Sequence, residues 1–86
     1  MLEELTIMGV LLTDRIDEAT EVQEVLTNHG CSIKTRLGMH ETDKEYCSKK
    51  GVILLELIGD KEDWKKLEND LNKIDGVIVK KMEFEF

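Results

Sequence analysis

The alternation of apolar and polar residues divides the chain into strands and helices. Apolar residues on both alternating faces are typical of buried strands, whereas apolar residues at every third or fourth position are typical of amphipathic helices. The helical spacing occurs at Ile16, Val22 and Leu26, and again at Trp64 and Leu71. Together these patterns predict strands at 5–12, 31–38, 52–58 and 77–86 and helices at 16–29 and 61–74.

Polar residues mark the ends of both predicted helices. Asp14 and Asp60 each precede a helical pattern, and a carboxylate at this position caps a helix by accepting backbone N–H bonds. Gly30 and Gly76 follow the two patterns, where glycine commonly ends a helix. The helices are therefore expected to begin and end near these residues.

The predicted order β-α-β-β-α-β joins two helical crossovers through a central hairpin. Such crossovers are right-handed and place both helices on the same face of the sheet. The order therefore predicts an α+β fold, the ferredoxin-like sandwich, with a four-stranded antiparallel sheet in the order 4-1-3-2. Because 86 residues suffice for one modest core, we expect a single domain spanning residues 1–86.

The two central strands are apolar on both faces, which predicts a second buried surface. We expect the odd-numbered residues of 5–12 and 52–58 to face the helices, with Gly9 allowing close helix approach. The opposite face then presents apolar side chains that no further layer covers, namely Met8, Val10, Leu12, Val52, Leu54 and Ile58. Because monomers rarely expose so much contiguous apolar surface, this face predicts a homo-oligomer, either a dimer or a tetramer. A shift of one residue or a bulge would redistribute this set.

In the two outer strands, 31–38 and 77–86, the face of the sheet on which some side chains lie is less certain from the pattern. Cys31 falls on the predicted buried parity of 31–38, which favours a small buried thiol. In 77–86, Val77 and Val79 suit the core, whereas the following apolar residues, Met82, Phe84 and Phe86, have the opposite parity. The last strand therefore either contains a bulge or directs its aromatic side chains toward a neighbouring subunit.

The net charge of −7 narrows the choice of partners. An acidic chain repels phosphate backbones and anionic lipids, so we expect neither direct nucleic-acid binding nor membrane association. No apolar run approaches the roughly 20 residues that span a bilayer. The chain has 2 cysteines and its N-terminus lacks the pattern of a secretory signal, so we expect a cytoplasmic protein with reduced thiols.

No spacing of residues predicts catalysis, and we expect a non-enzyme. The chain has no nucleophile and base at a recognisable spacing and no glycine-rich phosphate loop. Arg15 lies among acidic residues, which makes it a poor anion cradle by itself. The polar stretch 39–50 is the better candidate for a binding site. Next to it, Arg36 supplies a positive charge and Gly38 permits close approach to the backbone, and within it His40 adds a pH-sensitive contact.

These residues define two candidate sites, neither of which identifies its ligand or a cofactor. Arg36, Gly38 and His40 form the candidate small-molecule site, in which Arg36 supplies a donor fork for an anion. The alternative for Arg36 is a surface residue that pairs with Glu56 across the hairpin. His40 and Cys47 are the candidate metal ligands, with His29 from another subunit as a third, although their spacing matches no standard zinc motif.

Several short segments resemble the iron-only hydrogenase system regulators, a small family with an ACT-like fold. The similarity is carried by "IMGVLLTDR", "VLTNHG", "RLGM", "GVILLEL" and "KLENDLNKIDGVIVKK", which together cover most of the chain. This resemblance implies a ferredoxin-like regulatory domain similar to ACT domains and to the metal-sensing domain of nickel-responsive repressors. His29, His40 and Cys47 do not reproduce the ligand spacing of the nickel sensor.

Three functions follow from the sequence. The first is a homo-oligomeric, ligand-responsive regulatory module without its own DNA-binding segment, which acts through a small molecule or a partner protein. The second is a structural protein-interaction module that binds no small ligand. The third is a transition-metal sensor that uses His40 and Cys47.

Overall fold

The computed structural model describes residues 3–39 and 49–86. Within these ranges the strands and helices follow the predicted order, and a short 3₁₀ turn at Gly30–Ser32 precedes the second strand. The elements are β1 (Glu4–Leu12), α1 (Arg15–Asn28), β2 (Ile33–Met39), β3 (Gly51–Leu57), α2 (Lys61–Asn72) and β4 (Val77–Glu85).

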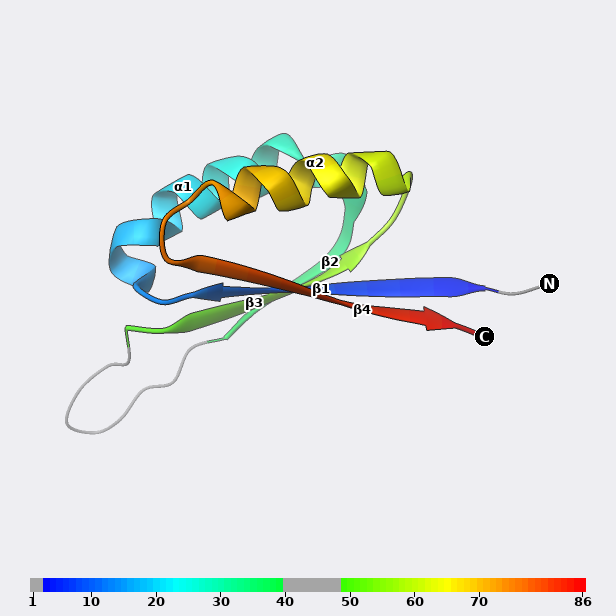
Figure 1. Ribbon diagram of the computed structural model, residues 1–86, viewed down its shortest axis with the longest axis horizontal. Helices are drawn as coiled ribbons and strands as arrows, with labels where there is room; N and C mark the ends of the chain where they lie inside the picture. The colour runs from blue at the N-terminus through cyan, green and yellow to red at the C-terminus, as the bar shows by residue number, and fades with distance from the viewer. Residues whose placement is uncertain (1–2, 40–48) are drawn as a thin grey trace.

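The four strands form one antiparallel sheet in the order β2-β3-β1-β4, which is the predicted order read from the other edge. Both helices lie over the same face of this sheet, and no helix or strand of the described residues covers the opposite face (Figure 1). The ferredoxin-like α+β fold is therefore confirmed. We call the uncovered side the open face.

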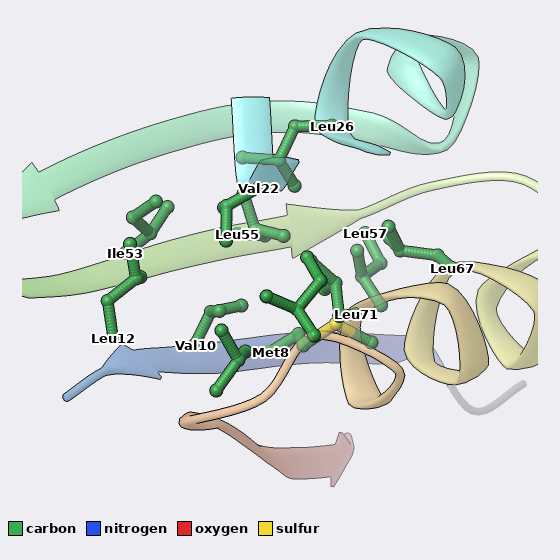
Figure 2. Close-up of a cluster of buried hydrophobic side chains, with 12 residues drawn as sticks. Met8, Val10, Leu12, Val22, Leu26, Ile53, Leu55, Leu57, Leu67 and Leu71 are labelled. Atoms are coloured by element: carbon green, nitrogen blue, oxygen red, sulfur yellow. The ribbon is translucent and has the colours of Figure 1, made fainter. Parts of the chain in front are cut away.

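The hydrophobic core fills the space between the sheet and the two helices (Figure 2). It consists of twelve buried residues, which are Met8, Val10, Leu12, Val22, Leu26, Ile53, Leu55, Leu57, Leu67, Leu71, Ile74 and Val77. Burial of one such side chain contributes about 1.5–3 kcal/mol. The helix-facing residues of β3 are the odd-numbered ones that the sequence predicts.

The predicted phase of β1 is wrong. Met8, Val10 and Leu12 were expected on the open face, but their side chains are 0%, 0% and 3% exposed and lie in the core. Register explains the difference, because Met8 pairs with Leu55 and Val10 pairs with Ile53, and directly paired residues share one face of a sheet. Since β1 is apolar on both faces, its hydrophobic pattern is compatible with either phase.

The β-bulge in β2 changes which of its side chains face the helices. Ile33 pairs with Leu57 and packs against the core, but the register shifts before Thr35, which pairs with Glu56. The extra residue moves Thr35 to the open face and places Arg36 on the helix side. Cys31 was expected to be buried, but it lies in the 3₁₀ turn before the strand and is exposed.

Strand β4 contains no such irregularity. Its pairing with β1 runs without a shift from Glu4 opposite Glu85 to Leu12 opposite Val77, so the bulge considered for this strand is wrong. Met82 pairs with Ile7 and Phe84 pairs with Leu5, and both side chains are exposed on the open face. The last apolar residues of the chain therefore point away from the helices.

The N-terminus of α1 is held at the corner where the β1–α1 connection meets the α2–β4 turn. Asp14 is the N-cap, and its carboxylate accepts a hydrogen bond of 3.4 Å from the backbone N–H of Asp17. The buried Glu18 carboxylate accepts a hydrogen bond of 3.0 Å from the backbone N–H of Asp14. Thr13 donates its hydroxyl to the carbonyl oxygen of Gly76 over 2.8 Å. Asp14 thus satisfies one free N–H group of the first turn, and Glu18 holds the N–H of the cap residue itself.

Candidate ligand-binding cleft

A cleft of about 290 Å³ opens between α1 and the neighbouring ends of the sheet strands. Helix α1 contributes one wall, and β1, β2 and β3 contribute the other. The lining residues are Leu12, Arg15, Ala19, Val22, Gln23, Arg36, Gly38, Gly51, Val52 and Ile53. The cleft thus combines an apolar base from the core with polar groups at its rim.

The structure places Arg36 and Gly38, two of the predicted ligand-binding residues, together in this cleft. The bulge in β2 gives both residues the helix-side parity, opposite Leu55 and Ile53 of β3. The alternative in which Arg36 pairs with Glu56 is wrong, because Glu56 belongs to the open face. Its carboxylate instead accepts a hydrogen bond of 3.1 Å from the Thr35 hydroxyl.

Gly38 keeps the β2 side of the cleft open. A Cβ atom built on Gly38 would meet no atom of the described residues within 4 Å, so these residues leave space beside the cleft at this position. Gly51 lies at the start of β3 and also lines the cleft. Two glycines allow a ligand to approach the backbone, where N–H groups can donate hydrogen bonds.

The charge of the cleft is opposite to that of the chain as a whole. Arg15 and Arg36 are part of the described lining and no carboxylate is, although the chain contains 19 acidic residues. Asp14 and Glu18 are close to Arg15 in sequence, but their carboxylates accept hydrogen bonds from the backbone at the beginning of α1. A cleft with this lining favours an anion.

The predicted metal ligands are not brought together in the described part of the chain. His40 and Cys47 lie outside the described residues. His29 is engaged within its own chain, where its Nε2 atom lies 2.8 Å from a carboxylate oxygen of Asp70. Among residues 3–39 and 49–86 there is no group of three or more metal-ligating side chains.

The contact between His29 and Asp70 joins the C-terminal end of α1 to α2. The hydrogen bond from His29 lowers the pKa of the Asp70 carboxyl below its usual value of 3.8, and the nearby Lys73 adds to this effect. The pair therefore has a structural role in linking the two helices.

Two further lining residues, Arg15 and Gln23, are not among the predicted site residues. Arg15 was set aside because acidic residues surround it in sequence. The sequence signal that could have identified Arg15 is the helix-capping pattern around it. Asp14 and Glu18 are residue types that accept backbone hydrogen bonds at the start of a helix. Gln23 lies two helical turns further along the same side of α1, and its amide offers both a donor and an acceptor.

The comparisons with known proteins extend this description. No model of a protein family matches the chain, and no curated protein matches it. Among solved structures, the uncharacterized protein TM1266 of Thermotoga maritima has a TM-score of 0.76 and 28% identity, over 95% of this chain and 99% of that one.

The nitrogen regulatory PII-like protein CPII of Thiomonas intermedia K12 has a TM-score of 0.68 and 11% identity, over 100% of this chain and 96% of that one. A PII-like signalling protein of Thermus thermophilus, TTHA0516, has a TM-score of 0.62 and 12% identity, over 99% of this chain and 91% of that one. The chain shares its fold with PII-like proteins. At these identities the likeness to them concerns the fold alone.

Two further sequence-based expectations concern the protein family and membrane-spanning helices. The resemblance to the iron-only hydrogenase system regulators is not confirmed by these comparisons and stays a prediction. Within the described ranges, neither helix is long and apolar enough to cross a lipid bilayer.

Proposed function

We propose that this chain is a homo-oligomeric regulatory module that responds to a small anionic metabolite bound in the cleft between α1, β2 and β3. The ligand carries a carboxylate or phosphate group, which contacts the guanidinium of Arg36 at the rim. The remainder of a small ligand packs on the apolar base of the cleft at the partly exposed Ala19. The module acts by binding, and no chemical step is assigned to it.

The observation that carries this proposal is the lining of the cleft. Arg36 reaches the cleft only because the β2 bulge reverses its face, and no described residue forms an ion pair with its side chain. A guanidinium presents a planar donor fork that matches a carboxylate or phosphate. The adjacent Gly38 leaves space for such a group beside the arginine.

The volume of the cleft limits the ligand. About 290 Å³ lies at the lower end of the range for small-molecule sites, so the cleft accommodates one anionic group with a small attached body. The structures of CPII contain ADP, AMP and bicarbonate. These ligands support a small anion here, and a whole nucleotide would extend beyond the cleft.

Thermal unfolding with added ligand tests the proposal. Inorganic phosphate, bicarbonate, AMP and ADP would each be titrated at constant ionic strength, with chloride as the reference anion. We expect a saturable rise in Tm with at least one of them, because a ligand that binds only the folded state stabilises it. Isothermal titration calorimetry would then give the Kd of that ligand.

Matched variants show where the ligand binds. Arg36→Ala should abolish the rise in Tm, whereas Lys34→Ala removes the same charge from the same strand, next to Glu56, and should leave the rise intact. Gly38→Val should also abolish it without lowering Tm of the free protein, since the added side chain meets no neighbour. Equal stabilisation of wild type and Arg36→Ala by every anion would contradict the proposal.

A further inference from the structure

The open face of the sheet is apolar from one edge to the other. Its residues have the parity opposite to the core and come from all four strands, namely Leu5, Ile7, Gly9 and Leu11, then Thr35 and Leu37, then Val52, Leu54 and Glu56, then Ile78, Lys80, Met82 and Phe84. Leu37 and Met82 are each 53% exposed, although they lie on opposite edges. Only Glu56 and Lys80 carry charge within this described set.

A two-stranded arm extends this face beyond the helices. Strand β3 pairs with β1 no further than Ile7, so residues 4–6 of β1 pair with β4 alone. The arm ends with two backbone hydrogen bonds between Glu3 and Phe86. Figure 1 shows the start of β1 and the end of β4 projecting past α2 on the same side.

The two surfaces of this arm differ sharply. On its helix side Glu4 lies directly opposite Glu85, and the Glu4 carboxylate lies 3.3 Å from the Lys61 ammonium of α2. On its open side Leu5 pairs with Phe84, which is 47% exposed, and Phe86 at the end is 64% exposed. A two-stranded ribbon is marginally stable in water, and no described residue of this chain covers the apolar side of the arm.

The dimensions of the open face match those of a stable protein interface. Four strands of seven to nine residues, at about 4.8 Å spacing and about 3.3 Å rise per residue, cover roughly 500 Å² in projection. The accessible area of side chains on such a surface exceeds its projection. It therefore approaches the roughly 800 Å² that each partner buries in a standard interface.

We infer that a second copy of this chain covers the open face and its arm, with the two sheets packed face to face about a two-fold axis. A two-fold interface brings residue i against j and j against i. Such an axis can set Lys80 of each copy near Glu56 of the other, a carboxylate that lies 3.9 Å from the Lys34 ammonium of its own chain. Stacked sheets lie about 10 Å apart, which buries the intervening apolar side chains.

The charge of the open face favours this occupant. Among its described residues Glu56 and Lys80 have opposite charges, and the Lys34 ammonium lies 3.9 Å from the Glu56 carboxylate. A basic protein or a nucleic acid would find no countercharge on this face, whereas a second copy offers a neutral apolar surface of the same extent. This inference names the partner for the oligomer in the proposed function, and it holds whether or not the cleft binds an anion.

Mass measurement in solution tests the inference. Size-exclusion chromatography with light scattering should give wild-type protein at 50–100 µM a mass of at least twice the 9.9 kDa of one chain. Met82→Lys should move the protein toward the monomer mass and raise the dissociation constant at least tenfold. Ile16→Lys is the matched control, because Ile16 is a 71% exposed residue of α1 away from the open face, and it should keep the wild-type mass.

A second substitution and the mass of the wild-type protein complete the test of this interface. Leu37→Lys, on the opposite edge of the sheet, should reproduce the effect of Met82→Lys, and circular dichroism confirms that each variant is folded. A monomeric wild type would overturn the inference and assign the face to a different protein. An oligomer that both substitutions leave intact would also overturn it, since the interface would then lie elsewhere. Loss of anion binding in Arg36→Ala with an unchanged mass separates this inference from the proposed function.

Discussion

The two faces of the sheet are similarly apolar, yet only one of them is covered by helices. On the helix side, Met8, Val10 and Leu55 are fully buried, and β4 contributes Lys81, which forms an ion pair with α2. On the open side, β4 contributes Ile78, Met82 and Phe84, which remain exposed. The comparison teaches that apolar composition alone does not determine which face of a strand meets the helices. The pairing register and the side chains of the edge strands determine it.

The largest expected effect is the difference between two adjacent leucines of β3. Leu55→Ala removes a fully buried side chain from the core, so the free energy of unfolding should fall by about 3 kcal/mol. Leu54 lies on the open face, and Leu54→Ala should cost less than about 1 kcal/mol in protein dilute enough to be monomeric. Urea denaturation at several protein concentrations measures both values.

The concentration series sharpens this comparison. If a second copy covers the open face, the cost of Leu54→Ala should grow with protein concentration, because association stabilises the folded state by mass action. The cost of Leu55→Ala should stay nearly constant. Equal losses for the two variants at every concentration would contradict the distinction between the faces.

The next largest effect is expected at Gly76, in the turn between α2 and β4. Gly76 has a φ of +84°, and a Cβ at this position would overlap the Glu18 carboxylate and lie 2.8 Å from the Thr13 hydroxyl. We expect Gly76→Ala to lower the free energy of unfolding by about 2–3 kcal/mol, since both backbone strain and a collision arise.

Gly59 provides the matched control for this substitution. Its φ is +86°, but a Cβ there would meet no atom within 4 Å. Gly59→Ala should therefore show the strain alone, a loss of about 1 kcal/mol. Similar losses for the two alanine variants would mean that the contact of Gly76 with Glu18 and Thr13 has no energetic role.

The sequence predicts the fold because its elements have clear periods and clear ends. Leu67 and Leu71 in α2 follow the helical spacing and are buried, and Asp14 caps α1 as its residue type indicates. The first turn of α1 is the exception. Ile16 fits the apolar spacing of the helix but lies outside the core. The helical period predicts on which side of the helix a residue lies. It does not predict whether the sheet extends far enough along the helix for that residue to contact it.

The site is predicted less completely because it depends on a local irregularity. Arg36 and Gly38 were identified from their residue types, but the β2 bulge that turns them toward α1 leaves no mark in the alternation of polar and apolar residues. Arg15 joins them only in the folded chain, because capping interactions use the acidic residues around it. His40 and Cys47 stay predictions, since they lie outside the described residues.

A smaller effect distinguishes two adjacent lysines of β4 that lie on opposite faces. The Lys81 ammonium lies 2.9 Å from the Glu68 carboxylate on the helix side, and this contact raises the pKa of Lys81 above its usual value of 10.5. Lys81→Met should cost about 0.5–1 kcal/mol at neutral pH. The same replacement of Lys80 should leave the stability of the monomer unchanged.

A double-mutant cycle and a change of pH isolate the ion pair. A raised pKa stabilises the folded state fully below the unfolded value of 10.5, and this contribution is lost as the pH rises through the folded value. With Glu68→Gln already present, Lys81→Met should have little further effect. Purely additive losses in the cycle would show that the two side chains do not interact.

The smallest expected effect is the contact that joins the two helices above the core. The pKa of Asp70 is lowered by its hydrogen bond with His29, so its contribution to stability is present above its unfolded pKa of 3.8 and is lost as the pH falls through the lower folded value. Asp70→Asn should therefore have a slightly lower Tm than wild type at pH 5–6, and the difference should shrink below pH 3.8. Glu21→Gln, an exposed change on α1, should show no such pH-dependent difference. A gap between wild type and Asp70→Asn that stays constant down to pH 2.5 would mean that the charge of Asp70 does not hold the helices together, and that the closed side of the sheet depends on its apolar packing alone.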